Sequence, residues 1–311
     1  MNRYRRIVVA TDLSPTAEAA LATAVQLARR DDAQLHVLHV RSAVQSVVST
    51  TFGIDDPASE LLGDRALRAW IRSAGFEEEV SVMRVIAGGH DAAPQILHYA
   101  RDEGADLIVL GQRGHYDRAI PFLGDEAHEV LREAPCDVLV TRGRREDAGA
   151  ESGIKRILAP VDLSTPSAEA LHVAAGLAAR LGAGLTVFLV LEPLALPPYL
   201  PLERLEKDNA THAAAALERF IEDAHLPVQH QRVIERGTPH RCIADYARRE
   251  KADLIVMGRA GLGRVERLFL GSVTERVLRT TPCAVLVHQD LPAQQKGSAA
   301  LGTAKMAAGV G

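Results

Sequence analysis

The chain carries one long internal repeat. Residues 105–111 (ADLIVLG) recur as residues 252–258 (ADLIVMG), and residues 135–140 (PCDVLV) recur as residues 282–287 (PCAVLV). The second copy follows the first after about 150 residues, which is too long for a solenoid repeat and ordinary for a domain. We therefore expect two domains with the same fold, each with its own hydrophobic core.

Composition places the domain boundaries. The first domain is expected over residues 1–143 and the second over residues 154–290. Residues 144–153 are polar and contain glycine, which is typical of a linker. Residues 291–311 are rich in alanine, glycine and glutamine and have no periodic apolar face, so a disordered tail is predicted there.

Apolar runs alternate with helical patterns in both halves. In the first half, strands are expected at 6–11, 34–40, 80–86, 106–110 and 137–141, and helices at 15–30, 58–74, 91–103 and 125–133. In the second half, strands are expected at 156–161, 184–190, 228–234, 253–257 and 284–288, and helices at 166–181, 203–223, 239–250 and 272–280. This alternation predicts an α/β fold of two tandem doubly wound domains, each with a five-stranded, mostly parallel, Rossmann-like sheet flanked by helices.

Two local patterns support these elements. The strands should be continuous apolar runs, because both faces of such a sheet are covered. A hydroxyl followed by proline is expected to cap the first helix of each half, at Ser14-Pro15 and at Thr165-Pro166.

A glycine pattern follows the fourth strand of the second half. Gly258 and Gly261 come directly after an apolar run, and nine residues later Gly271 and Ser272 open a helix. Backbone N–H groups at such a turn form an anion site with the positive end of the helix dipole, and glycine lets a phosphate approach the backbone. The structural alternative is a capping box between Ser272 and Glu275, which needs no ligand.

The first half has the same frame with one charged replacement. Gly111, Gly114 and Gly124 match, but Asp125 stands where the second half has Ser272. A carboxylate about 4 Å from a phosphate charge costs about 4 kcal/mol at an effective dielectric constant of about 20. Aspartate also suits a helix start, so it can occupy the anion position itself. We expect the first domain to bind triphosphate weakly or not at all, unless a bridging metal ion reverses the repulsion.

These elements, in this order, resemble the universal stress protein family. The family pattern is a strand that ends in an aspartate and, late in the domain, G-x2-G-x9-G-(S/T). The second half matches it through Pro160, Val161, Asp162, Gly258, Gly261, Gly271 and Ser272. The resemblance covers residues 4–142 and 154–289, and it implies a five-stranded α/β fold with ATP at the sheet edge and Mg²⁺ held through its phosphates.

The resemblance also implies roles for individual residues. Those that would contact adenine, ribose or the α-phosphate are Pro160, Val161, Asp162, Val190, Met257 and Gly258. Those that would hold the β- and γ-phosphates are Gly261, Gly271, Ser272 and Val273. A structural alternative for Asp162 is a helix-entry role, in which its carboxylate accepts turn amides.

The resemblance further implies how the chain assembles. Members of the family dimerise through their last strands, so strands 137–141 and 284–288 would pair within this chain. A further homodimer is left open. Arg259, Arg264 and Arg267 lie in or beside the glycine loop and could offset phosphate charge, although no family rule assigns them this role.

Composition narrows the classes of protein to which this chain could belong. The net charge of −4 argues against a nucleic-acid-binding surface. The sequence has neither a signal peptide nor an apolar run of about 18 residues, so a cytoplasmic protein without a membrane partner is expected. Cys136 and Cys283 precede equivalent strands, where small buried core residues are expected. No Cys/His cluster has metal-ligand spacing, so no protein metal site is predicted.

Three functional hypotheses follow. The first is a cytoplasmic stress-response regulatory protein that binds ATP in its C-terminal domain, with the N-terminal domain as a degenerate structural partner. The second is a slow ATPase or self-phosphorylating protein with Ser272 or Thr274 as acceptor. Because we find no positioned base, at most weak hydrolysis is expected. The third is a dimerisation or adaptor module that needs no nucleotide.

Overall fold

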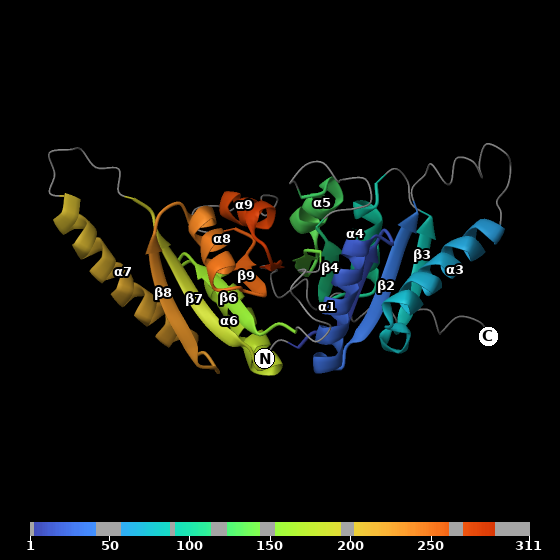
Figure 1. The fold of residues 1–311 in the computed structure, drawn as a ribbon, viewed down its shortest axis with the longest axis horizontal. Coiled ribbons are helices and arrows are strands. Elements are labelled where there is room, and N and C mark those ends of the chain that lie inside the picture. Colours follow the sequence, from blue (N-terminus) through green and yellow to red (C-terminus); the bar gives the residue numbers. More distant parts are fainter. Residues whose placement is uncertain are drawn as a thin grey trace, which may run out of the picture. The chain divides into compact units, whose positions relative to one another are not determined.

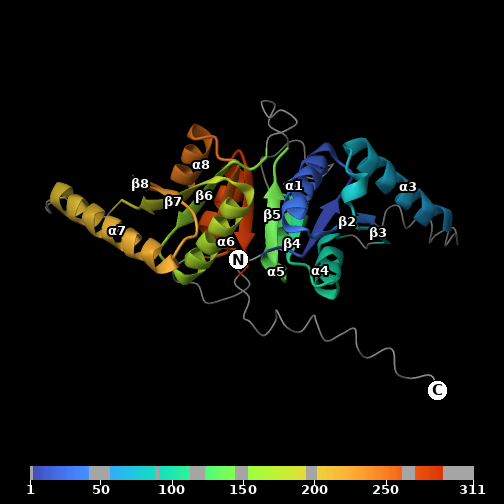
Figure 2. The same cartoon turned by 90° about the horizontal axis from the view of Figure 1, so that it is seen from below.

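The computed structural model describes residues 3–41, 57–87, 91–112, 123–143, 153–193, 202–260 and 270–289. The chain divides into two compact units, an N-terminal unit within residues 3–144 and a C-terminal unit within residues 145–288 (Figure 1). Each unit by itself is an α/β domain with helices on both faces of a parallel sheet (Figure 2).

The N-terminal unit has the strand order β3-β2-β1-β4-β5, and its neighbouring strands pair in parallel. Its strands are β1 (Arg6–Thr11), β2 (Gln34–Arg41), β3 (Val82–Ala87), β4 (Leu107–Gly111) and β5 (Asp137–Thr141). Its helices are α1 (Pro15–Asp31), α3 (Pro57–Ala74), the one-turn η1 (Glu77–Glu79), α4 (Ala93–Asp102) and α5 (Asp125–Glu133). The chain order reverses between β1 and β4, so the carboxyl ends of these strands form the topological switch point.

The C-terminal unit has the order β10-β9-β6-β7-β8, again with parallel neighbours. Its strands are β6 (Arg156–Val161), β7 (Gly184–Leu191), β8 (His230–Arg236), β9 (Leu254–Gly258) and β10 (Ala284–His288). Its helices are α6 (Thr165–Leu181), α7 (Leu202–Ala224), α8 (Pro239–Arg249) and α9 (Ser272–Thr280). The switch point lies between the carboxyl ends of β6 and β9. The predicted fold class is confirmed in both units.

The inner strands are the buried apolar runs that the sequence predicted, but the outer ones are not. β4 is LIVLG and β9 is LIVMG, and their first four residues are buried. β8 is HQRVIER and has no buried residue. Val82 at the start of β3 is 36% exposed. The prediction that all strands are apolar runs was therefore wrong for β3 and β8, because one edge of each strand has no neighbouring strand in its unit.

Most boundaries differ from prediction by one or two residues, and three differences have a local explanation or were not anticipated. β8 begins at His230 rather than 228, because the chain bends at Pro227 and Val228, and it ends before Gly237, whose φ is +148°. The short helix η1 was not predicted. The first helix of the C-terminal unit is capped by Ser164 and not by Thr165: the Ser164 hydroxyl accepts the N–H of Ser167, and Thr165 is the first helical residue.

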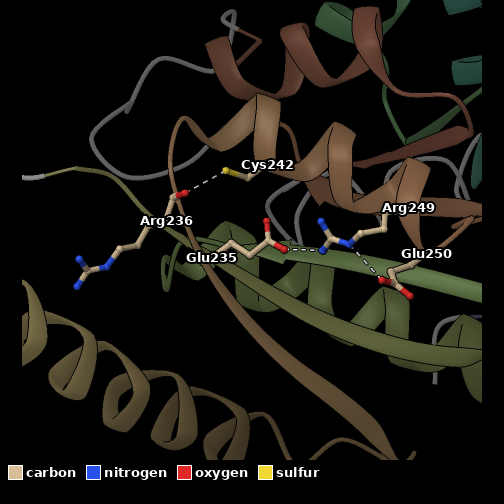
Figure 3. A network of polar contacts seen from close by, with 5 residues as sticks. All are labelled: Glu235, Arg236, Cys242, Arg249 and Glu250. Atoms are coloured by element: carbon tan, nitrogen blue, oxygen red, sulfur yellow. Dashed lines mark hydrogen bonds and ion pairs between the residues drawn. The ribbon is translucent and has the colours of Figure 1, made fainter.

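Helix α8 is held against the sheet by an aromatic and a charged contact. The ring of Tyr246 packs on that of Phe188 in β7, with centroids 4.7 Å apart. Arg249 pairs with Glu235 of β8 at 2.6 Å and with Glu250 at 3.2 Å (Figure 3), and its guanidinium lies 5.0 Å from the Tyr246 ring centroid. The ion pairs are exposed and contribute about 1 kcal/mol at most, so the buried rings supply most of this attachment.

A buried histidine makes the N-terminal unit sensitive to acid. His36 of β2 is 4% exposed, and its Nδ1 lies 2.9 Å from the hydroxyl of Tyr99 in α4. Burial lowers the pKa of His36 below its ordinary value of 6.5, and Arg6 lowers it further while Glu103 opposes the shift. As pH falls below about 6.5, the unfolded chain gains a proton that the folded unit resists. Stability is therefore lost from that pH down to the folded-state pKa.

The His36→Phe variant should flatten this pH dependence. Urea unfolding can be followed by the fluorescence of Trp70, the one tryptophan in the sequence, which is buried in α3 of the same unit. Wild type should lose more stability between pH 7.5 and 5.5 than His36→Phe. The control is His98→Gln, since the His98 side chain is 72% exposed. An unchanged slope in His36→Phe would contradict the assignment to His36.

Candidate functional site

The two glycine turns of the C-terminal unit lie side by side at the carboxyl edge of its sheet. Gly258 ends β9, and Gly271 is the residue before α9. The N–H of Gly271 donates to the carbonyl of Arg259 at 2.8 Å, and the hydroxyl of Thr274 donates to the carbonyl of Gly258 at 3.0 Å. These bonds join the turn at residues 258–260 to the first turn of α9.

Packing explains both glycines. A Cβ on Gly258 would lie 3.1 Å from the carbonyl oxygen of Pro166 in α6, and one on Gly271 would lie 3.1 Å from the carbonyl oxygen of Arg259. Such contacts are tighter than side chains normally make, so the neighbouring backbone would have to move. The sequence interpretation, that phosphate approach requires these glycines, is therefore not needed to explain them. The same contacts show that three segments meet here: the starts of α6 and α9, and the turn after β9.

The start of α9 presents backbone donors. Its first main-chain bond runs from the N–H of Glu275 to the carbonyl of Gly271 at 2.9 Å. The N–H groups of Ser272, Val273 and Thr274 therefore have no acceptor within the helix, and Gly271 has no side chain with which to cap them. Ser272 is exposed beside these donors.

The capping box weighed from the sequence does not form. Ser272 is the first residue inside α9 rather than its cap, and Glu275 pairs with Arg279 one turn later at 2.6 Å. Of the two hydroxyls considered as phosphate acceptors, that of Thr274 is 3% exposed and bonded to Gly258, so Ser272 is the accessible one.

The loop after the first strand has a leucine in the left-handed region in both units and is strained there. Asp162 follows β6, and its Oδ1 accepts the N–H of Ser164 at 3.1 Å and also the Ser164 hydroxyl. Leu163 between them has φ +64°, a conformation that costs a bulky residue about 1–3 kcal/mol. In the N-terminal unit, Leu13 has φ +65°, and Oδ1 of Asp12 accepts the Ser14 N–H at 3.0 Å. The helix-entry role weighed for Asp162 is thus present.

The other sequence-predicted residues are distributed along the same edge. Pro160 and Val161 are buried at the end of β6, Met257 is buried near the end of β9, and Val190 is half-buried near the end of β7. Val273 is half-buried in the first turn of α9. Gly261, Arg264 and Arg267 lie outside the described residues, as do Gly114 and the predicted tail.

The N-terminal unit differs at the corresponding place by a second carboxylate that sequence reasoning missed. Asp125 and Glu126 both lie exposed in the first turn of α5. The Glu126 carboxylate accepts the N–H of Ala92 at 3.0 Å and that of Ala93 at 2.5 Å, at the start of α4. The C-terminal unit has Val273 at the position of Glu126, so only the N-terminal unit places a carboxylate between two helix starts.

The described residues also bear on metal sites, membrane spans and buried thiols. Those residues contain no group of three or more His, Cys, Asp or Glu side chains that could hold a metal ion. Of the described helices, none has the length and apolarity needed to span a bilayer. Cys136 and Cys283 are buried, as expected, and burial raises the pKa of the Cys136 thiol.

Fold and site together define a tandem, doubly wound α/β protein with glycine turns at a switch point. The model of the universal stress protein family matches residues 3–142 and 153–289, and the chain belongs to this family.

Relatives agree with this assignment, and a solved structure agrees with the fold. A universal stress protein of Thermus aquaticus is 39% identical over 144 residues, covering 43% of this chain and 97% of the relative. YxiE of Bacillus subtilis is 33% identical over 151 residues, covering 45% and 99%. A functionally unknown protein from Pseudomonas aeruginosa has a TM-score of 0.67 at 22% identity and covers 96% of this chain and 97% of that one. Each relative thus matches one unit, whereas the solved structure matches both in fold.

Proposed function

We propose that this stress-response protein binds an adenine nucleotide, ATP, in its C-terminal unit and acts as a cytoplasmic regulatory protein. The observation that carries the proposal is the hydrogen bond between the Gly271 N–H and the Arg259 carbonyl, at 2.8 Å. It places the turn after β9 beside the donors of Ser272, Val273 and Thr274. Those donors and the dipole of α9 suit a phosphate chain.

The residues present fit a nucleotide. The carboxyl ends of β6, β7 and β9 lie along one edge, where ligands of doubly wound folds bind. Asp162 follows β6, and Val190 is the last residue but one of β7; they would meet the ribose and the base. Mg²⁺ would be held through the phosphates, whose charge it offsets.

The N-terminal unit is proposed as the structural partner with a degenerate site. Asp125 and Glu126 add two negative charges to the helix start that would otherwise receive phosphate.

Calorimetric titration of the intact chain with Mg·ATP should give one site. One site per chain is expected because, of the two equivalent helices α5 and α9, α5 begins with two carboxylates and α9 begins with none. Before the titration, the absorbance of the purified protein near 260 nm should be checked for co-purified nucleotide, because bound nucleotide would already occupy the site. Two sites would contradict the degenerate role of the N-terminal unit, and no binding to nucleotide-free protein would overturn the proposal.

A further inference from the structure

A cluster of basic side chains lies beside the start of α9. Arg276 is exposed in α9, Arg241 is exposed in the first turn of α8, and His240 precedes it. Figure 1 shows α8 and α9 packed next to each other. Within the ranges that the structure describes, neither Arg241 nor Arg276 has an ion-pair partner, in contrast to Arg248 and Arg279.

Helix geometry places the Arg276 side chain near the N–H groups that are proposed to bind phosphate. Arg276 follows Ser272 by four residues, so the two side chains lie on one face of α9. Helical side chains lean toward the N-terminus, which carries the guanidinium back over the first turn. Burial lowers the pKa of His240, and the charges of Arg276 and Arg241 lower it further, as expected when all three lie close together.

The N-terminal unit lacks this basic cluster. Glu129 follows Asp125 in α5 just as Arg276 follows Ser272 in α9, and Pro94 takes the place of Arg241. The basic cluster is thus specific to the unit whose helix start carries no carboxylate.

We infer that Arg276, with Arg241 beside it, contacts the outermost phosphates and makes the C-terminal unit select nucleoside triphosphates over monophosphates. This inference rests on the proposed function, since it assigns specificity within the same site. In the proposed binding mode a monophosphate would end near Gly258, whereas a longer phosphate chain would extend along the first turn of α9 to the face that Ser272 and Arg276 share.

The test is titration of the full chain with ATP and with AMP. Arg276→Ala should weaken ATP binding about tenfold, as loss of a charge-assisted hydrogen bond does, and Arg276→Glu should weaken it further. AMP binding should change less than about twofold. Arg276→Lys keeps the charge and should retain most of the ATP affinity. The control is Arg248→Ala, which removes an exposed charge from the last turn of the neighbouring helix α8.

The outcomes separate the two proposals. Equal losses for ATP and AMP, or no loss with Arg276→Glu, would overturn the role of Arg276 and leave nucleotide binding standing. A wild-type chain that binds neither nucleotide would overturn the proposed function, and this inference with it. Circular dichroism and thermal unfolding of each variant show whether the fold is kept.

Discussion

The Ser272→Asp variant should lose ATP affinity and gain stability. The substitution gives α9 the residue that begins α5, at an exposed position where no packing changes. A carboxylate about 4 Å from a phosphate charge costs about 1 kcal/mol in water and about 4 kcal/mol at an effective dielectric constant of about 20. Affinity should therefore fall at least about fivefold and up to about a thousandfold.

The opposite sign in stability makes this prediction specific. A carboxylate in the first turn complements the helix dipole and stabilises the helix by about 0.3–1 kcal/mol. Calorimetric titration measures the affinity, and denaturant unfolding followed by circular dichroism measures the stability. Asparagine has nearly the same shape as aspartate but no charge, so the Ser272→Asn variant should bind ATP much as wild type does. If it loses as much affinity as Ser272→Asp, size rather than charge is responsible and the electrostatic account is wrong.

The fold could be predicted from the sequence because its signals are local and occur twice. Apolar runs such as residues 107–110 and 254–257 become buried central strands, and each prediction in one half is tested again in the other. The edge strand β8 was harder to place. Its polar residues reflect a missing neighbour, which a single-sequence pattern does not show.

The site was predictable in outline but not in its contacts. The spacing of Gly258, Gly271 and Ser272 indicates a turn and a helix start, but whether two turns meet is a tertiary fact, seen in the bond to Arg259. The tight approach of Pro166 to Gly258 joins segments about 90 residues apart, which only the parallel pairing of β6 with β9 brings together. No sequence motif predicts such a contact.

Glu126 is the clearest residue that sequence reasoning missed. In the sequence, Glu126 is one more acidic residue beside Asp125 at a helix start, which is a common and uninformative pattern. Its role depends on the start of α4, 34 residues earlier in the chain, lying within hydrogen-bond distance of its carboxylate. The available signal was the comparison of the repeats, which pairs Glu126 with Val273.

The reciprocal change should give the N-terminal unit a site. In the Asp125→Ser, Glu126→Val variant, α5 begins with the two residues that begin α9, and two negative charges leave the helix start. Calorimetric titration should then show two ATP sites per chain where wild type shows one. Asp125→Ser alone should gain less, because Glu126 still lies at the same helix start.

The gain has an expected cost that can be measured separately. Ala92 and Ala93 lose their acceptor, and because one of these contacts is exposed, water replaces part of it, so the N-terminal unit should lose about 1 kcal/mol. Trp70 fluorescence reports that loss, since Trp70 lies in α3 of this unit.

Adding Ser272→Asp to the double variant should return the stoichiometry to one, with the remaining site in the N-terminal unit. A folded double variant that still binds a single ATP would show that differences elsewhere, such as Thr11 in place of Val161, keep the N-terminal unit from binding.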